Sequence, residues 1–158
     1  MLKEAGWSAM DADGGASSAI LGTFVAALGE VEIGEEMDCL CLAKSFDAGL
    51  RAVLRHTKAT QGDKTMMDAL FPAVEAFEQA ASSGQTAEIA MNSAAAAAER
   101  GADATKQMIA RYGRAKSLGE RSLGHIDPGA ASIALLFAAF GSALAQEGAA
   151  RQIAPQFS

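Results

Sequence analysis

Apolar residues recur at three- and four-residue intervals along most of the chain, the spacing that places side chains on one face of an α-helix. No stretch of useful length alternates apolar and polar positions with the period of a β-strand. The pattern therefore predicts an all-α fold, an antiparallel bundle of about six helices. The predicted helices cover about residues 17–28, 36–56, 63–82 and 86–112, and a last long helix begins at Pro128.

Individual residues mark two helix starts and one helix break. Asp127 followed by Pro128 predicts a helix start, because aspartate caps free backbone N–H groups and proline suits the first helical position. Thr86 predicts the cap of the helix that follows it, at about residues 86–112. Pro72 lies inside the apolar stripe of residues 63–82. It predicts a kink or two short helices there, since proline removes a backbone donor and crowds the preceding turn.

Length and charge narrow the class of protein. We expect residues 1–158 to form a single domain, with a flexible start at 1–13 and a frayed tail at 148–158. Thirteen basic and nineteen acidic residues give a net charge of −6, which argues against nucleic-acid binding because that needs a basic face. Cys39 and Cys41 are too few and too close for a disulfide framework or a zinc site. A reducing, cytoplasmic compartment is expected.

The uncharged stretch at residues 128–145 has two interpretations, a membrane span and a buried helix. Ser132, Gly141, Ser142 and many alanines leave it short of the ~20 strongly apolar residues that a span needs. The first 15 residues also lack the apolar region of a secretory signal. We therefore expect a buried core helix and no membrane partner.

Three segments interrupt the apolar pattern: residues 13–18 (DGGASS), 62–68 (GDKTMMD) and 113–129 (GRAKSLGERSLGHIDPG). Small residues before a helix leave its free N–H groups open to an anion, although the same pattern also serves as a plain helix cap. Asp63 fits a helix cap as well as a ligand contact, and its segment lacks the spacing of a Walker A loop. Arg114 and Arg121 suit phosphate but equally complement a helix C-terminus. Spacing alone therefore indicates a helical domain with several helix starts that can share an anion.

Four strings together resemble a known family. GGAS, GTF, GDKTMMDALFPAVEAF and GRAKSLGERSLGHIDPGAAS, in this order and at this spacing, resemble the nucleotide-binding L subunit of dihydroxyacetone kinase, the DhaL family. The resemblance implies an all-α barrel of antiparallel helices, here in an N-terminally shortened form, closed at one end by the nucleotide. It implies that the chain supplies ATP, or holds ADP that a phosphotransferase protein rephosphorylates in place. A separate K subunit would hold the short-chain ketose.

The resemblance also implies which residues contact the nucleotide, by match to the family's motifs. Ala16 and Ser17 would lie against the phosphates, Met66 would touch the nucleotide, and Arg114 would lie beside it. The start of the last helix would line the site. The implied residues are Ala16, Ser17, Met66, Arg114, Asp127, Pro128 and Gly129, with Gly15, Thr57, Asp63 and Thr65 as weaker candidates. No catalytic residue is implied.

The family's Mg²⁺ site is the main departure. The family holds this ion with carboxylates of an N-terminal Asp-rich loop, and no residue before Asp13 matches that loop, since Asp11 and Asp13 lie in another motif. Three further positions differ from the family: it usually has glycine where this chain has Ser18 and Thr57, and tyrosine where this chain has Ser117. The sequence either starts downstream of the family's N-terminus or has drifted to a non-catalytic form, and the intact later motifs favour the first. We expect the chain as given to be weak or silent as a kinase.

The function that the resemblance implies is the phosphoryl-donor subunit of a dihydroxyacetone-type kinase. A catalytically silent homologue that binds nucleotide or its partner in a regulatory role is the alternative. A helical scaffold that only associates through its small-residue faces is a third hypothesis.

Overall fold

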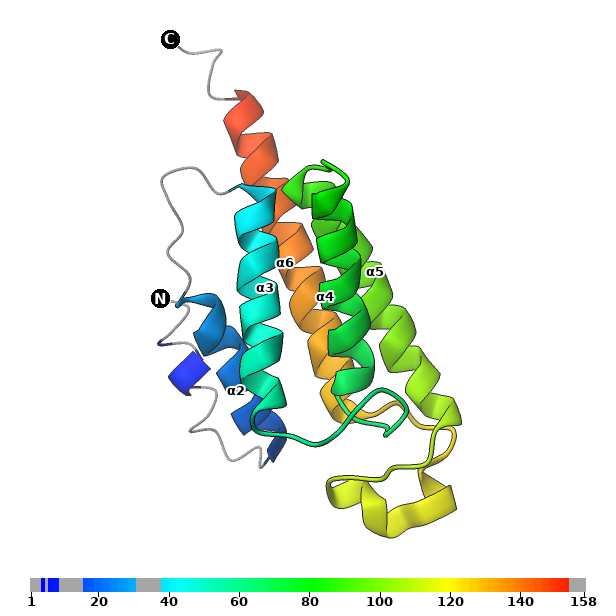
Figure 1. The fold of residues 1–158 in the computed structure, drawn as a ribbon. Coiled ribbons are helices and arrows are strands. Elements are labelled where there is room, and N and C mark those ends of the chain that lie inside the picture. Colours follow the sequence, from blue (N-terminus) through cyan, green and yellow to red (C-terminus); the bar gives the residue numbers. More distant parts are fainter. Residues whose placement is uncertain (1–3, 5, 9–15, 31–37, 154–158) are drawn as a thin grey trace.

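The computed structural model describes residues 4, 6–8, 16–30 and 38–153, and this part of the chain is helical and without strands (Figure 1). The predicted all-α class is confirmed. The elements are α2 (Ala16–Leu28), α3 (Cys39–Leu54), α4 (Met67–Ser82), α5 (Ala87–Ala104), the 3-10 segments η1 (Thr105–Gln107) and η2 (Arg114–Ser122), and α6 (Pro128–Ile153).

Successive long helices run antiparallel and pack side by side, α2 on α3, α3 on α4, α4 on α5 and α5 on α6 (Figure 1). Because the direction alternates, the N-termini of α2, α4 and α6 lie at one end of the bundle. Residues 55–66 and 105–127 connect the helices at that end, which we call the loop end. The topology therefore collects the described parts of the three predicted binding segments, residues 16–18, 62–68 and 113–129, at a single end of the molecule.

Phenylalanine rings from four helices form the centre of the core. The Phe46 ring of α3 lies 4.9 Å from that of Phe77 in α4 and 5.4 Å from that of Phe137 in α6, measured between centroids. Phe24 of α2 lies 6.2 Å from Phe46. These separations are typical of favourable aromatic pairs. The apolar faces predicted from the periodicity thus meet in one core.

Pro72 lies inside α4, which is one continuous helix that begins at Met67 rather than near residue 63. The prediction of two short helices was wrong. An ordinary residue at 72 would donate its N–H to the carbonyl of Asp68, and proline cannot. That carbonyl instead faces Gly101 of α5, where an added Cβ would lie 2.1 Å from it. A glycine on the neighbouring helix therefore accommodates the carbonyl that the proline leaves free.

The helix before the long polar loop differs from expectation at its end. Thr86 caps α5 as predicted and accepts a hydrogen bond from the N–H of Ile89. The helix ends at Ala104 instead of continuing to residue 112. The buried Thr105 follows, with its hydroxyl donating to the carbonyl of Ala102 and accepting the N–H of Asp127. The hydrogen bond between Thr105 and Asp127, which precedes α6, therefore stands where α5 was expected to continue.

α6 is the one described helix long and apolar enough by composition to cross a membrane, over Pro128–Gln146. Ile133 and Phe137 lie fully buried in the core, but only 28% of the residues in this stretch are buried. α6 therefore buries one face, whereas a wholly buried core helix was expected. α6 continues through Gly148 to Ile153, where a frayed tail was expected. Most of residues 1–13, expected to be flexible, lie outside the described residues, as do 154–158.

Candidate functional site

The starts of α4 and α6 adjoin at the loop end and bring three predicted residues together. A Cβ added to the buried Gly129 would lie 3.2 Å from the Cβ of Met66 and 3.0 Å from Oδ2 of Asp127. Met66 is itself buried, and Pro128 occupies the exposed first position of α6. Any side chain at position 129 would crowd this junction, so glycine is the residue that lets the two helix starts meet.

Asp127 caps α6, as its position before Pro128 predicts. Its Oδ2 accepts the N–H of Ala130 at 2.8 Å. Burial raises the pKa of the Asp127 carboxyl above its ordinary value, while hydrogen bonds from the N–H groups of Ala130 and Gly129 act in the opposite direction. The nearby Asp68 carboxylate adds to the increase, and Lys64 opposes it. The carboxylate therefore occupies the N–H groups at the start of α6 that would otherwise lack a partner.

The N-terminus of α2 contributes less defined geometry. Ala16 is its first residue and Ser17 is exposed in its first turn, at the loop end. Gly15 lies outside the described residues. Ser17 is therefore placed at the same end of the bundle as Met66 and Asp127.

Arg114 begins η2 directly after Gly113, whose φ of 67° falls in the left-handed region that favours glycine. Its side chain is exposed, and within the described part of the chain the guanidinium has no hydrogen-bond or ion-pair partner. The five N–H donors of this arginine are therefore available to an anion at the loop end. The structure does not bring Arg114 into contact with Met66 or Asp127.

The two threonine candidates have local roles. Thr57 accepts the N–H of Ala59 on its hydroxyl. Thr65 accepts the N–H of Met67 and so caps the first turn of α4. Both hydroxyls keep a donor of their own for a ligand.

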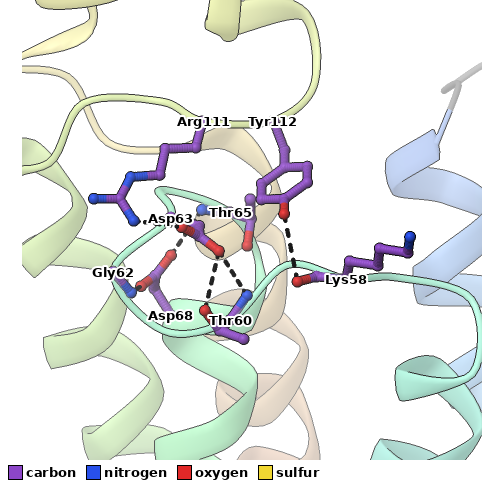
Figure 2. A network of polar contacts seen from close by, with 8 residues as sticks. All are labelled: Lys58, Thr60, Gly62, Asp63, Thr65, Asp68, Arg111 and Tyr112. Carbon is purple, nitrogen blue, oxygen red and sulfur yellow. Dashed lines mark hydrogen bonds and ion pairs between the residues drawn. The ribbon is translucent and has the colours of Figure 1, made fainter.

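Asp63 does not cap the following helix, so that interpretation was wrong. Its Oδ2 accepts the N–H and the hydroxyl of Thr60, at 2.8 and 3.0 Å, and its Oδ1 accepts Nη1 of Arg111 at 3.2 Å (Figure 2). Asp68 organises the turn before α4 in place of Asp63. Its carboxylate accepts the N–H groups of Gly62 and Thr65. No sequence pattern singles out Asp68 or Arg111, because their partners lie in other turns of the fold.

Lys64 is the most consequential residue that the sequence analysis missed. Its side chain is buried, and Nζ donates to the carbonyls of Thr105 and His125, each at 2.6 Å. Its φ of 57° is unusual for a residue other than glycine. One ammonium group thus ties the turn before α4 to η1 and to the segment that leads into α6. Periodicity carries no signal for such a residue, because it lies between two helices.

Asp63→Asn is expected to flatten the pH dependence of stability in acid. Hydrogen bonds, chiefly from the N–H of Thr60, hold the pKa of the Asp63 carboxyl below its ordinary value of 3.8. The stabilisation is present above that value and is lost as the pH falls through the lower folded-state pKa. Urea denaturation at several pH values from about 6 to 3 should show a smaller loss of stability in the variant. Asp103→Asn, at an exposed carboxylate, is the control; an equal flattening there would contradict the assignment.

A metal site is not evident in the described residues, where no three His, Cys, Asp or Glu side chains cluster to hold an ion. Asp11 and Asp13 lie outside them. The described side chains of the loop end do not form the carboxylate cluster that the expected Mg²⁺ needs, so we assign no part of phosphoryl transfer to a metal. What the loop end offers is the positive dipole ends of three helices, which favour anions such as phosphate. The first N–H groups of α4 and α6 are already paired within the protein, with Thr65, Met66 and Asp127.

Sequence comparison relates the chain to known proteins. The sequence model of the DAK2 domain matches residues 1–142. The ADP-binding subunit DhaL of the PEP-dependent dihydroxyacetone kinase of Escherichia coli (strain K12) is 38% identical over 134 residues, 84% of this chain and 64% of that protein. The DhaL subunit of kinase 1 of Listeria innocua is 37% identical over 137 residues, 87% of this chain and 64% of that protein. The L-erythrulose kinase of Pectobacterium atrosepticum is 37% identical over 146 residues, 91% of this chain and 25% of that protein.

The chain spans just under two thirds of the length of the two DhaL subunits, at 64% of each. The resemblance to the DhaL family that the motifs indicated is confirmed by these identities. Since the domain match runs from residue 1 to residue 142, the chain belongs to the DAK2-domain family.

Proposed function

We propose that this chain is the nucleotide-binding, phosphoryl-donor subunit of a dihydroxyacetone-type kinase. It holds ADP or ATP at the loop end and passes a phosphoryl group to a short-chain ketose. The observation that carries the proposal is the junction of Met66, Asp127 and Gly129, where two helix starts meet at the same end of the bundle as the exposed Arg114. Identity of 37–38% to two subunits named as ADP-binding supports it.

The chain's own residues would bind and orient the phosphates. The positive dipole ends of α2, α4 and α6 face the loop end, and the guanidinium of Arg114 adds a positive charge there. Phosphoryl transfer depends mainly on positioning and on neutralising charge, and these groups supply both. Met66 and Gly129 would contact the nucleotide from the junction, and Ala16 and Ser17 from the first helix start.

A ketose-binding K subunit is the proposed partner, and a phosphotransferase protein is the proposed source of phosphate where the donor is ADP rephosphorylated in place. The two DhaL relatives are named as subunits of PEP-dependent kinases, and this favours the phosphotransferase protein over ATP as the source of phosphate. We propose a cytoplasmic location, with neither nucleic acid nor membrane as a partner. Mg²⁺ is expected with the nucleotide, as in the family, and its ligands are not assigned.

Calorimetric titration with ADP, with and without Mg²⁺, tests nucleotide binding directly. Saturable binding supports the proposal, and a rise in melting temperature with ADP should accompany it because the ligand binds the native state. Mixing the chain with a K subunit, ATP, Mg²⁺ and dihydroxyacetone then tests phosphoryl transfer. ADP binding without transfer in any such mixture would favour the regulatory alternative, and absence of ADP binding would overturn the proposal.

Arg114→Ala is expected to weaken ADP binding by about 10- to 100-fold, the effect of losing hydrogen bonds from a charged donor. The melting temperature should stay within about 2 °C of the wild type, because an exposed side chain contributes little to packing. Lys116→Ala is the matched control, since it removes one exposed positive charge from the same segment. A large fall in melting temperature with unchanged affinity would contradict the assignment of Arg114 to the site.

A further inference from the structure

The segment that leads to Arg114 is anchored to the turn before α4 at one residue. Asp63 accepts the backbone N–H of Arg111 on its carbonyl at 3.1 Å, and Nη1 of the same arginine on Oδ1 at 3.2 Å. Tyr112 adds a longer contact, from its hydroxyl to the carbonyl of Lys58 at 3.5 Å (Figure 2). The backbone and the side chain of Arg111 are thus both held by Asp63.

Asp63 is itself a fixed point. Its side chain is 7% exposed, and its second carboxylate oxygen is occupied by the N–H and hydroxyl of Thr60. The Asp68 carboxylate braces the same turn through Gly62 and Thr65. Because this turn leads directly into Met66 and α4, Arg111 is tied to the element that carries one of the proposed nucleotide contacts.

The distance along the chain makes this anchor relevant to Arg114. Arg114 follows Arg111 by three residues, so its Cα lies within ~11 Å of the anchored position even when the chain is fully extended. Gly113, with its φ of 67°, is the conformationally permissive residue between them. Without the anchor, the start of η2 would be less restricted relative to α4.

The energetics favour a positioning role over a stabilising one. The Arg111 side chain is 72% exposed. Water therefore screens the guanidinium even though Asp63 is buried, and an ion pair with such an exposed partner contributes little to stability. Breaking the pair should therefore change the position of the segment more than it changes the stability of the fold.

We propose that Asp63 and Arg111 form a positioning pair that sets where the guanidinium of Arg114 meets the phosphates of a bound nucleoside diphosphate. The inference rests on the proposed function and deepens it. Asp63, a weaker candidate for nucleotide contact in the sequence analysis, acts here through Arg111 and Arg114. Arg111 would likewise act without touching the nucleotide.

Arg111→Gln is the central variant, and ADP affinity measured by calorimetry is the first readout. We expect affinity to fall about 3- to 10-fold, with recovery in Arg111→Lys, whose ammonium can still pair with Asp63. Arg51→Gln is the matched control, because it breaks the Arg51–Asp47 pair of α3 in which the arginine is also 72% exposed. Its affinity should equal that of the wild type.

A double-mutant cycle separates positioning from direct contact. If Arg111 acts through Arg114, Arg111→Gln should cause no further loss of affinity in the Arg114→Ala background. Additive losses would mean that Arg111 touches the nucleotide itself or acts independently, and would overturn the inference. Equal affinities of wild type and Arg111→Gln would overturn it as well.

A second readout needs no nucleotide and so distinguishes failure of this inference from failure of the proposed function. Limited trypsin digestion, followed by mass spectrometry, measures cleavage after Arg114. We expect cleavage to be several-fold faster in Arg111→Gln than in wild type or Arg51→Gln, because the released segment fits the protease more readily. Unchanged cleavage would overturn the positioning role even if the wild type binds ADP. Faster cleavage in a protein that binds no ADP would support the anchor and overturn the proposed function alone.

Discussion

Gly101→Ala is expected to lower the free energy of unfolding by about 2–3 kcal/mol, although alanine is the better helix former by about 1 kcal/mol. The added Cβ would lie 2.1 Å from the carbonyl oxygen of Asp68 and 3.0 Å from the Cα of Ala69. Both atoms belong to the backbone of α4, so no flexible side chain can move aside. α4 and α5 would have to separate, and urea denaturation should report the loss.

Gly141→Ala is the control for this prediction. Gly141 lies inside α6, and its added Cβ would come no closer than 3.4 Å to Oδ1 of Asn92, an ordinary contact. Alanine there should be neutral or stabilising by up to about 1 kcal/mol, as helix propensity predicts. If both substitutions stabilise the protein, the close contact between α4 and α5 does not require glycine at position 101, and the prediction is wrong.

Lys64→Met is expected to cost about 3 kcal/mol of stability, because it removes one charged donor from two carbonyl groups, those of Thr105 and His125. Methionine has nearly the same length and would keep the unusual φ of 57°, so the comparison isolates the ammonium group. For a domain of this size, a loss of about 3 kcal/mol corresponds to a fall in melting temperature of roughly 6–12 °C. Thermal unfolding followed by circular dichroism measures it.

Lys44→Met is the matched control, because Lys44 is exposed on α3. Its melting temperature should stay within about 2 °C of the wild type. Lys64 also joins the turn that carries Met66 to the segment that carries Asp127, so Lys64→Met should weaken ADP binding too. Wild-type stability in Lys64→Met would show that water replaces the ammonium at both carbonyls.

The sequence alone predicted the features that depend on neighbours along the chain. Helical periodicity reports which face of a segment is buried, and it identified α2, the whole of α3 and the face of α6 that carries Ile133 and Phe137. Caps act within three residues, so Thr86 and Asp127 were predicted and confirmed. The motif strings predicted the family, which the domain match confirms.

The tertiary structure decided where polar side chains find distant partners. Asp63 pairs with Arg111 across 48 positions of sequence, and Lys64 reaches carbonyls 41 and 61 positions away. The same holds for Pro72, which stays within a continuous helix because Gly101 of another helix leaves room for the carbonyl of Asp68. A local pattern records whether a side chain is apolar and on which face it lies. It does not record which distant group a buried charge will meet, because that depends on how the helices are packed together.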